Sequence, residues 1–118
     1  MTSLRILVVD DNAVIGALIA EMLESIGHDV CGIEATEADA VGAALAQKPD
    51  LMIVDAQLGT GSGVAAMAQI LHAGPMPHVF ISGGGIGPVS PDSVILRKPF
   101  MEADLVEAIQ RARRAPVS

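Results

Sequence analysis

The fold is decided by one stretch of sequence, Leu51-Met52-Ile53-Val54-Asp55-Ala56-Gln57-Leu58-Gly59. Four apolar residues lead into one carboxylate, and turn-forming residues bound them on both sides. A short apolar run of this kind is typical of a strand that is buried on both faces. Asp55 is then expected at the end of that strand, where ligands bind in open parallel α/β sheets. For a single aspartate, a cap or a loop hydrogen bond is the simpler explanation. Whether Asp55 belongs to a binding site therefore depends on the residues at the ends of the other strands.

The composition describes a small domain with an aliphatic core. The 118 residues are expected to form one domain, residues 1–118, large enough for a single hydrophobic core. Apolar residues make up 51% of the chain and aromatic residues 2%, so Ala, Val, Ile, Leu and Met must build that core. The net charge of −7 argues against non-specific nucleic-acid binding, and it suits a carboxylate-rich site that takes a cation.

Nothing in the sequence indicates a membrane or an oxidising compartment. No apolar run approaches the ~20 residues that span a bilayer. Asp10 and Asp11 interrupt the N-terminus before a signal peptide could form. The single Cys31 excludes an internal disulfide and a cysteine-based zinc cluster. We therefore expect a cytoplasmic protein with no membrane partner.

Four further apolar runs are expected to form strands, and a helical pattern follows three of them. Strands are expected at residues 4–9, 30–33, 79–81 and 94–96. Helical spacing of apolar residues predicts four inner helix faces: Ile15, Leu18, Ile19, Met22, Leu23 and Ile26; Val41 and Leu45; Val64, Met67, Ala68 and Leu71; and Leu105, Ala108, Ile109 and Ala112. Alternating strands and helices predict a parallel sheet with right-handed crossovers. We expect a doubly wound α/β fold of five strands in the order 2-1-3-4-5, as in flavodoxin-like proteins.

Polar side chains stand at the ends of strands that this order places side by side. Asp10 and Asp11 end the first strand and Asp55 ends the third, which gives three carboxylates at one crevice. Two unit charges ~4 Å apart repel by ~4 kcal/mol at an effective dielectric of ~20, so such a cluster is costly unless a cation bridges it. Oxygen ligands of this kind suit Mg²⁺, which often meets a phosphate.

The next two strand ends add a hydroxyl and a positive charge. Ser82 can donate a hydrogen bond, and Lys98 can neutralise an anion. Three acids, a hydroxyl and a lysine are what a phosphorylated aspartate needs. Asp55 would attack phosphorus while Mg²⁺ and Lys98 neutralise the phosphoryl oxygens and Ser82 holds one of them.

These residues resemble the receiver domain of bacterial response regulators, over essentially the whole chain. The resemblance is carried by Val8-Val9-Asp10-Asp11-Asn12, Ile53-Val54-Asp55, Gly63, Ser82 after Val79-Phe80-Ile81, and Lys98-Pro99-Phe100. It implies that Asp10, Asp11, Asp55 and the main-chain carbonyl of Gln57 bind Mg²⁺. It also implies that Asp55 accepts phosphate from a histidine kinase, while Ser82 and Lys98 contact the phosphoryl group.

The resemblance implies a single-domain response regulator in a phosphorelay. Its partners would be a sensor histidine kinase or a histidine phosphotransfer protein, and a separate downstream effector. It would be no enzyme beyond its own phosphorylation and dephosphorylation. Two alternatives stay open: a receiver-like interaction module that works without phosphorylation, and an aspartyl-nucleophile phosphohydrolase. Such hydrolases resemble D-x-D, and Gln57 stands where their second acid would be.

Three departures from the family pattern bear on how a signal would leave the domain. Gly59 replaces the usual proline four residues after the phosphoacceptor, and Ile95 replaces the usual aromatic residue three positions before the lysine. Residues 83–91 hold four glycines and two prolines, which disfavour a helix by ~1 and ~3 kcal/mol per residue. We therefore expect the fourth helix to be short or missing. Residues 83–93 are predicted to be a mobile, largely non-helical segment that phosphorylation orders.

Overall fold

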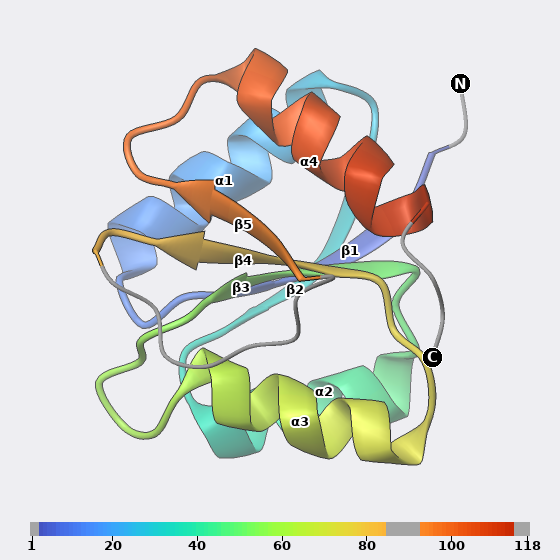
Figure 1. Cartoon of the computed structure of the whole chain (residues 1–118). Coiled ribbons are helices and arrows are strands. Elements are labelled where there is room, and N and C mark those ends of the chain that lie inside the picture. Colours follow the sequence, from blue (N-terminus) through green and yellow to red (C-terminus); the bar gives the residue numbers. More distant parts are fainter. Residues whose placement is uncertain (1–2, 85–92, 115–118) are drawn as a thin grey trace.

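A parallel five-stranded sheet with helices on both faces forms the molecule (Figure 1). The computed structural model describes residues 3–84 and 93–114. The strands are β1 (Arg5–Val9), β2 (Asp29–Glu34), β3 (Leu51–Asp55), β4 (His78–Ser82) and β5 (Val94–Arg97). The helices are α1 (Ala13–Ser25), α2 (Glu37–Gln47), α3 (Gly63–Ala73) and α4 (Glu102–Arg114). The strand order β2-β1-β3-β4-β5 confirms the predicted doubly wound α/β fold.

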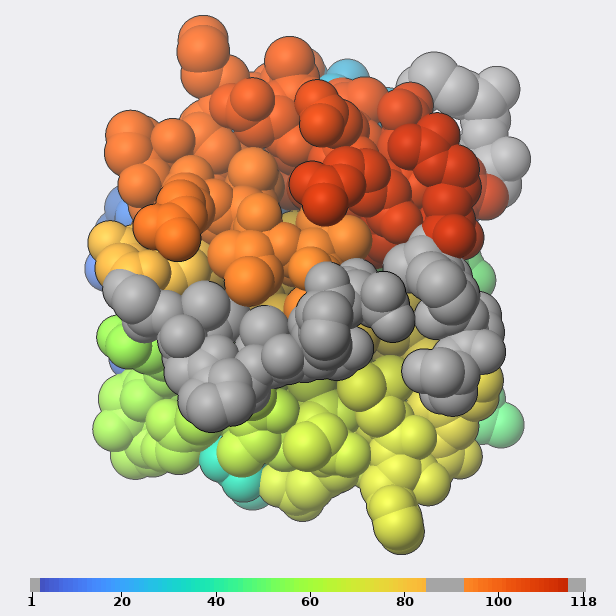
Figure 2. Space-filling view, in the orientation of Figure 1, coloured from blue at the N-terminus to red at the C-terminus, as the bar shows by residue number. Residues whose placement is uncertain are grey.

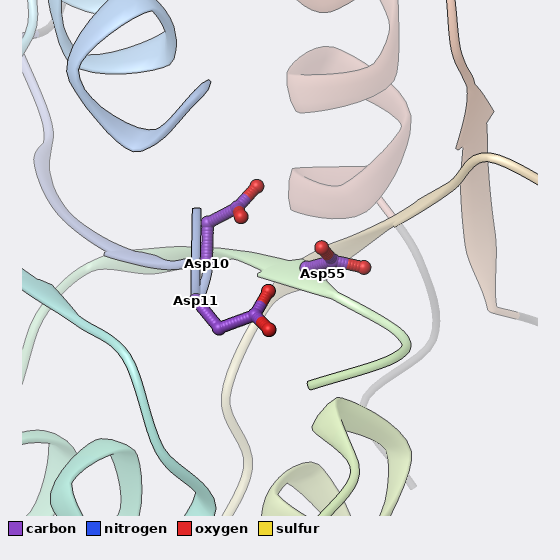
Figure 3. A group of neighbouring side chains, drawn as sticks. All are labelled: Asp10, Asp11 and Asp55. Carbon is purple, nitrogen blue, oxygen red and sulfur yellow. The ribbon is translucent and has the colours of Figure 1, made fainter. Parts of the chain in front are cut away.

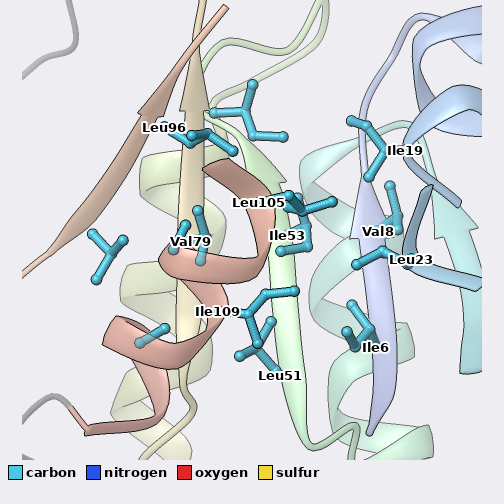
Figure 4. Close-up of a cluster of buried hydrophobic side chains, with 14 of the residues drawn as sticks. Ile6, Val8, Ile19, Leu23, Leu51, Ile53, Val79, Leu96, Leu105 and Ile109 are labelled. Atoms are coloured by element: carbon cyan, nitrogen blue, oxygen red, sulfur yellow. The ribbon is translucent and has the colours of Figure 1, made fainter. Parts of the chain in front are cut away.

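The two faces of the sheet carry separate hydrophobic layers. Helices α1 and α4 cover one face and α2 and α3 cover the other (Figure 1). Because side chains alternate along a strand, Ile53 packs under α1 and α4 (Figure 4), while Met52 and Val54 pack toward α2 and α3. All five residues of β3 are buried. In the space-filling view, the orange-to-red atoms of β5 and α4 lie above the green-to-yellow atoms of α3 (Figure 2).

The predicted inner face is confirmed for α4 and is partly wrong for the other three helices. All four residues predicted for α4 are buried. In α1, Leu18 is 50% exposed, and the buried residues are Gly16, Ile19, Ala20 and Leu23. In α2, Leu45 is exposed and Ala40 and Ala44 are buried; in α3, Ala68 and Leu71 are exposed and Ala66 and Ile70 are buried beside Met67.

The physical reason is that small residues let these helices lie close to the sheet. A Cβ atom built at Gly16 would lie 3.0 Å from Cγ2 of Ile33 in β2, so the helix and the strand are already in near contact there. The inner faces of α1, α2 and α3 therefore include small Gly or Ala residues, while Leu18, Leu45 and Leu71 are exposed. Hydrophobic spacing alone cannot show this rotation, because it weights large residues most.

Three helices begin at the same end of the sheet as the acidic residues, and a side-chain cap stabilises the start of each. The side chains of Asn12, Thr36 and Ser62 each accept hydrogen bonds from amides in the first turn of α1, α2 and α3. Such caps satisfy donors that the helix itself leaves free. Within the described residues, no helix is long and apolar enough to cross a membrane.

The expectation for residues 83–93 remains a prediction. The described residues contain four helices, and α4 follows β5 directly. The predicted short or missing helix, and the segment that phosphorylation would order, fall mainly on residues 85–92, which lie outside the described residues.

Candidate functional site

Three carboxylates meet where β1 and β3 end. Asp10 and Asp11 follow β1 directly, Asp55 is the last residue of β3, and the two strands are neighbours with Val9 opposite Val54. One oxygen from each carboxylate lies within 4.8 Å of the others. In Figure 3 the side chains of Asp10, Asp11 and Asp55 lie close together, and that of Asp11 extends toward Asp55. The structure thus brings together the three acids that the sequence placed at one crevice.

Lys98 supplies the positive charge that the sequence predicted at this edge. Its Nζ lies 3.6 Å from Oδ2 of Asp55 and 3.9 Å from Oδ2 of Asp10. Its backbone amide donates to the carbonyl of Ser82 at 2.9 Å, which fixes the chain just after β5. The Lys98 side chain is about one-third exposed, so solvent screens both ion pairs. One lysine therefore offsets only part of the negative charge of three aspartates.

Asp10 is the most deeply buried member of the cluster. Its Oδ1 accepts a hydrogen bond from the amide of Asn12 at 2.9 Å, whereas its buried Oδ2 accepts none from any described residue. Burial raises the pKa of Asp10, and the negative charges of Asp55 and Asp11 act in the same direction. The Asn12 hydrogen bond and Lys98 oppose this rise. The site therefore disfavours the ionised form of Asp10.

The donor set fits a hard divalent cation. All the side-chain ligands offered are carboxylate oxygens, which Mg²⁺ prefers. Oδ2 of Asp10, which is buried and accepts no hydrogen bond from the part of the chain that the structure describes, is the kind of atom that a cation would satisfy. Gln57 lies in the loop after β3, and its amide donates to Oδ1 of Asp55 at 3.1 Å.

Ser82 lies at the predicted strand end, and its hydroxyl makes hydrogen bonds with the backbone two residues further on. It is the last residue of β4, directly after Ile81, which pairs with Asp55. The buried hydroxyl donates to the carbonyl of Gly84 and accepts from the amide of Gly84 at 3.3 Å. The hydroxyl must leave the Gly84 carbonyl before it can donate to a new acceptor.

Two glycines in the loop after β3 have structural roles that sequence reasoning did not assign. The amide of Gly59 donates to Oδ2 of Asp11 at 2.8 Å. A proline at this position has no N–H to donate, so this glycine makes a contact that the usual family residue cannot. At Gly63, a Cβ atom would overlap the carbonyl of Asp55 and come within 2.8 Å of Val54. The clue in the sequence was the departure at Gly59 and the place of Gly63 among the residues that carry the resemblance.

Glu37 is a further residue at this edge that the sequence did not single out. Its Oε1 accepts from the amide of Ser62 at 3.0 Å, and its Oε2 accepts from Nε2 of Gln69 at 2.8 Å. Glu37 is 25 positions from Ser62 along the chain. No local motif links them, and only the packing of α2 beside α3 brings them together.

The chain is similar to known proteins over most of its length. The profile described as "Response regulator receiver domain" matches residues 6–86. The "Transcriptional regulatory protein PdtaR" of Mycobacterium tuberculosis is 32% identical over 114 residues, which are 92% of this chain and 56% of that protein. The "Phyllosphere-induced regulator PhyR" of Methylorubrum extorquens is 29% identical, over 92% of this chain and 43% of that protein. The chain thus spans about half the length of these curated relatives.

A solved structure shows the same fold at full length. The solution structure of the Erythrobacter litoralis PhyR receiver domain superposes with a TM-score of 0.84 at 29% identity, and it covers 100% of this chain and 98% of that one.

Proposed function

The chain belongs to the response regulator receiver domain family, and from this premise we propose that Asp55 accepts a phosphoryl group in a Mg²⁺-dependent reaction. The observation that carries the proposal is the meeting of Asp10, Asp11, Asp55 and Lys98 at one edge of the sheet. Carboxylates crowded in this way are costly without a cation.

Each residue has a role that follows from its position. An oxygen of Asp55 attacks phosphorus, the bond from phosphorus to the donor breaks, and the leaving group keeps the electron pair. Lys98, already 3.6 Å from Asp55, neutralises the phosphoryl oxygens. The Ser82 hydroxyl turns from Gly84 to donate to one of those oxygens. Asp10, Asp11, Asp55 and the Gln57 carbonyl would hold Mg²⁺, which supplies charge neutralisation when bound.

We propose a histidine kinase or a histidine phosphotransfer protein as the donor, and a separate effector protein as the recipient of the signal. Membership of the receiver family supports this choice of partners. The acidic chain, with its net charge of −7, suits protein partners better than nucleic acid. A cytoplasmic location fits a domain with one free, half-buried cysteine.

The test is phosphorylation of the purified protein by a small phosphodonor, with and without Mg²⁺, followed by intact mass. We expect one added phosphate with Mg²⁺ and none after Asp55→Asn. Asp39→Asn, on the exposed first turn of α2, is the control for losing an acid and should still gain the phosphate. An undiminished mass shift in Asp55→Asn would refute the assignment. No shift in the wild-type protein would favour an interaction module that works without phosphate.

A further inference from the structure

Glu37 connects helix α2 to the loop that follows Asp55. It is the first residue of α2 and is half-buried. One carboxylate oxygen accepts from the Ser62 amide at 3.0 Å and the other accepts from the Gln69 side chain at 2.8 Å. Hydrogen bonds to an ionised acceptor are about twice as strong as those between neutral groups. The side chain thus joins three elements: α2, the loop of residues 56–62, and α3.

The loop backbone lies directly on this side chain. A Cβ atom built at Gly61 would be 2.5 Å from Oε1 and 2.9 Å from Cβ of Glu37, so only glycine fits there without a shift. Gly61 also has φ of +88°, which glycine adopts at low cost. The sequence therefore supplies a glycine where the loop passes over Glu37.

Ser62 is also the residue through which the rest of the loop is held. It forms an isolated antiparallel bridge with Gln57. Its hydroxyl donates to the carbonyl of Ala56 at 3.4 Å, and the next amide, of Gly63, donates to the same carbonyl at 3.1 Å. Between these points the Gly59 amide reaches Asp11. Fixing Ser62 therefore holds Gln57 directly, and it anchors one end of the loop that carries Gly59.

We propose that Glu37 is a positioning residue for the metal site. By holding Ser62 it keeps the loop of residues 56–62 in the shape that presents the Gln57 carbonyl and the Gly59 amide to the acidic cluster. The inference rests on the proposed function, because it assumes that Gln57 and Asp11 take part in binding Mg²⁺. The alternative is that Glu37 only adds negative charge near the cation, or at the start of α2.

Calorimetric titration of Mg²⁺ into four variants distinguishes a role of Glu37 in positioning the loop from an effect of its charge alone. Outer-shell partners typically change metal affinity by 10–100-fold; we expect Glu37→Ala to weaken binding by about tenfold, at the low end of that range. Glu37→Gln loses the same charge and keeps an oxygen for the Ser62 amide, while Gln69 can reverse its amide to accept from the new side chain. It should bind Mg²⁺ nearly as tightly as the wild type. Asp39→Ala removes one charge from the same helix turn and should change affinity by less than about twofold, since exposed charges are screened.

Gln69→Ala is the variant to use if Glu37→Ala does not fold. It removes one of the two contacts of Glu37 and replaces no residue of the loop. The metal affinity should therefore fall by a smaller factor than in Glu37→Ala. Equal weakening in Glu37→Ala and Glu37→Gln would show that charge alone acts, and would overturn the proposal. Unchanged affinity in Glu37→Ala would overturn it too.

Hydrogen exchange of the metal-free protein gives a readout that does not depend on the metal. The amides of Ser62 and Gly59 should exchange faster in Glu37→Ala than in the wild type, and Glu37→Gln should restore their protection. If the wild-type protein binds no Mg²⁺, the proposed function fails, and this exchange experiment still decides whether Glu37 holds the loop. If both amides exchange at the wild-type rate in Glu37→Ala, Glu37 does not hold the loop and the proposal is refuted.

Discussion

Asp10 is a residue whose burial opposes its own ionisation. The folded state raises the pKa of Asp10, chiefly through burial, so the native protein holds this proton more tightly than the unfolded chain does. The associated stability is present below the unfolded pKa and is lost as pH rises through the folded pKa. At neutral pH the ionised side chain therefore lowers the free energy of unfolding.

Asp10→Asn should raise the free energy of unfolding when no divalent cation is present. The asparagine keeps an oxygen for the Asn12 amide and removes the buried charge. The same change should remove most of the stabilisation by Mg²⁺, which is ~2.7 kcal/mol for a ligand at 100 times its dissociation constant. Urea unfolding of both proteins, with and without Mg²⁺, measures both effects. A lower midpoint for the metal-free variant would contradict the argument.

Gly63 and Gly42 should respond in opposite directions to the same substitution. A Cβ atom at Gly63 would overlap the Asp55 carbonyl, so Gly63→Ala should cost about 3 kcal/mol, at the upper end for overpacked sites. Gly42 is exposed within α2 with nothing within 4 Å of a built Cβ, so Gly42→Ala should stabilise by about 1 kcal/mol. Denaturant midpoints of the two variants test the contrast. A neutral Gly63→Ala would show that β3 and α3 can separate without penalty.

At the level of secondary structure, the sequence predicts an element and its buried face best where the spacing of apolar residues allows one interpretation only. Strand β3 is apolar up to its last residue, Asp55, and is buried throughout, and α4 has one apolar stripe on a charged background. In α1 and α3, large apolar residues are adjacent in sequence, as in Leu18-Ile19 and Ile70-Leu71, so two faces compete. Packing against the sheet decides between them, and that information is not local.

The difference between local patterns and non-local packing also explains which residues of the candidate site the sequence predicts. Asp10, Asp11, Asp55, Ser82 and Lys98 were found because each ends or follows a strand, and the strand order then places them together. The contacts of Glu37 and Gly59 depend on the path of a loop, which no periodic pattern encodes.

Two leucines of α1 provide a direct test of the corrected helix face. Leu23 is fully buried and Leu18 is 50% exposed. Leu23→Ala should cost about 2–5 kcal/mol, the usual range for a buried leucine. Leu18→Ala should stay within about 1 kcal/mol, because part of its surface is already in water. Chemical denaturation of both variants measures the difference. Similar losses would mean that α1 lies on the sheet with the face that the sequence first suggested.

At the scale of the whole molecule, two histidines link stability to pH. Burial lowers the pKa of His28, and Arg113 acts in the same direction. Burial likewise lowers the pKa of His78, which lies edge-on to Phe80. The unfolded chain therefore takes up protons first as pH falls. The stability from these residues is present above the ordinary histidine pKa of ~6.5 and is lost as pH falls below it.

The melting temperature should therefore decrease between pH 7.5 and pH 5.5. Nδ1 of His28 accepts from the Leu4 amide at 3.1 Å, a contact that needs an unprotonated nitrogen. His28→Asn keeps an acceptor for that amide and should reduce the slope. His72→Asn, on the exposed side of α3, controls for the loss of a histidine. A slope in His28→Asn equal to that of the wild type would refute the role of this partly buried histidine.

The order of the strands also has a consequence for how the chain folds. Ile6 of β1 pairs with Leu51 of β3, whereas the other neighbouring strands pair residues much closer in sequence, such as Ile6 with Val30 and Ile53 with Val79. Closing a longer loop costs more chain entropy. The pairing of β1 with β3 is also the step that brings Asp10 and Asp11 beside Asp55. The pairing that closes the longest loop thus coincides with the step that brings like charges together, and a divalent cation present during refolding should speed assembly of the central sheet.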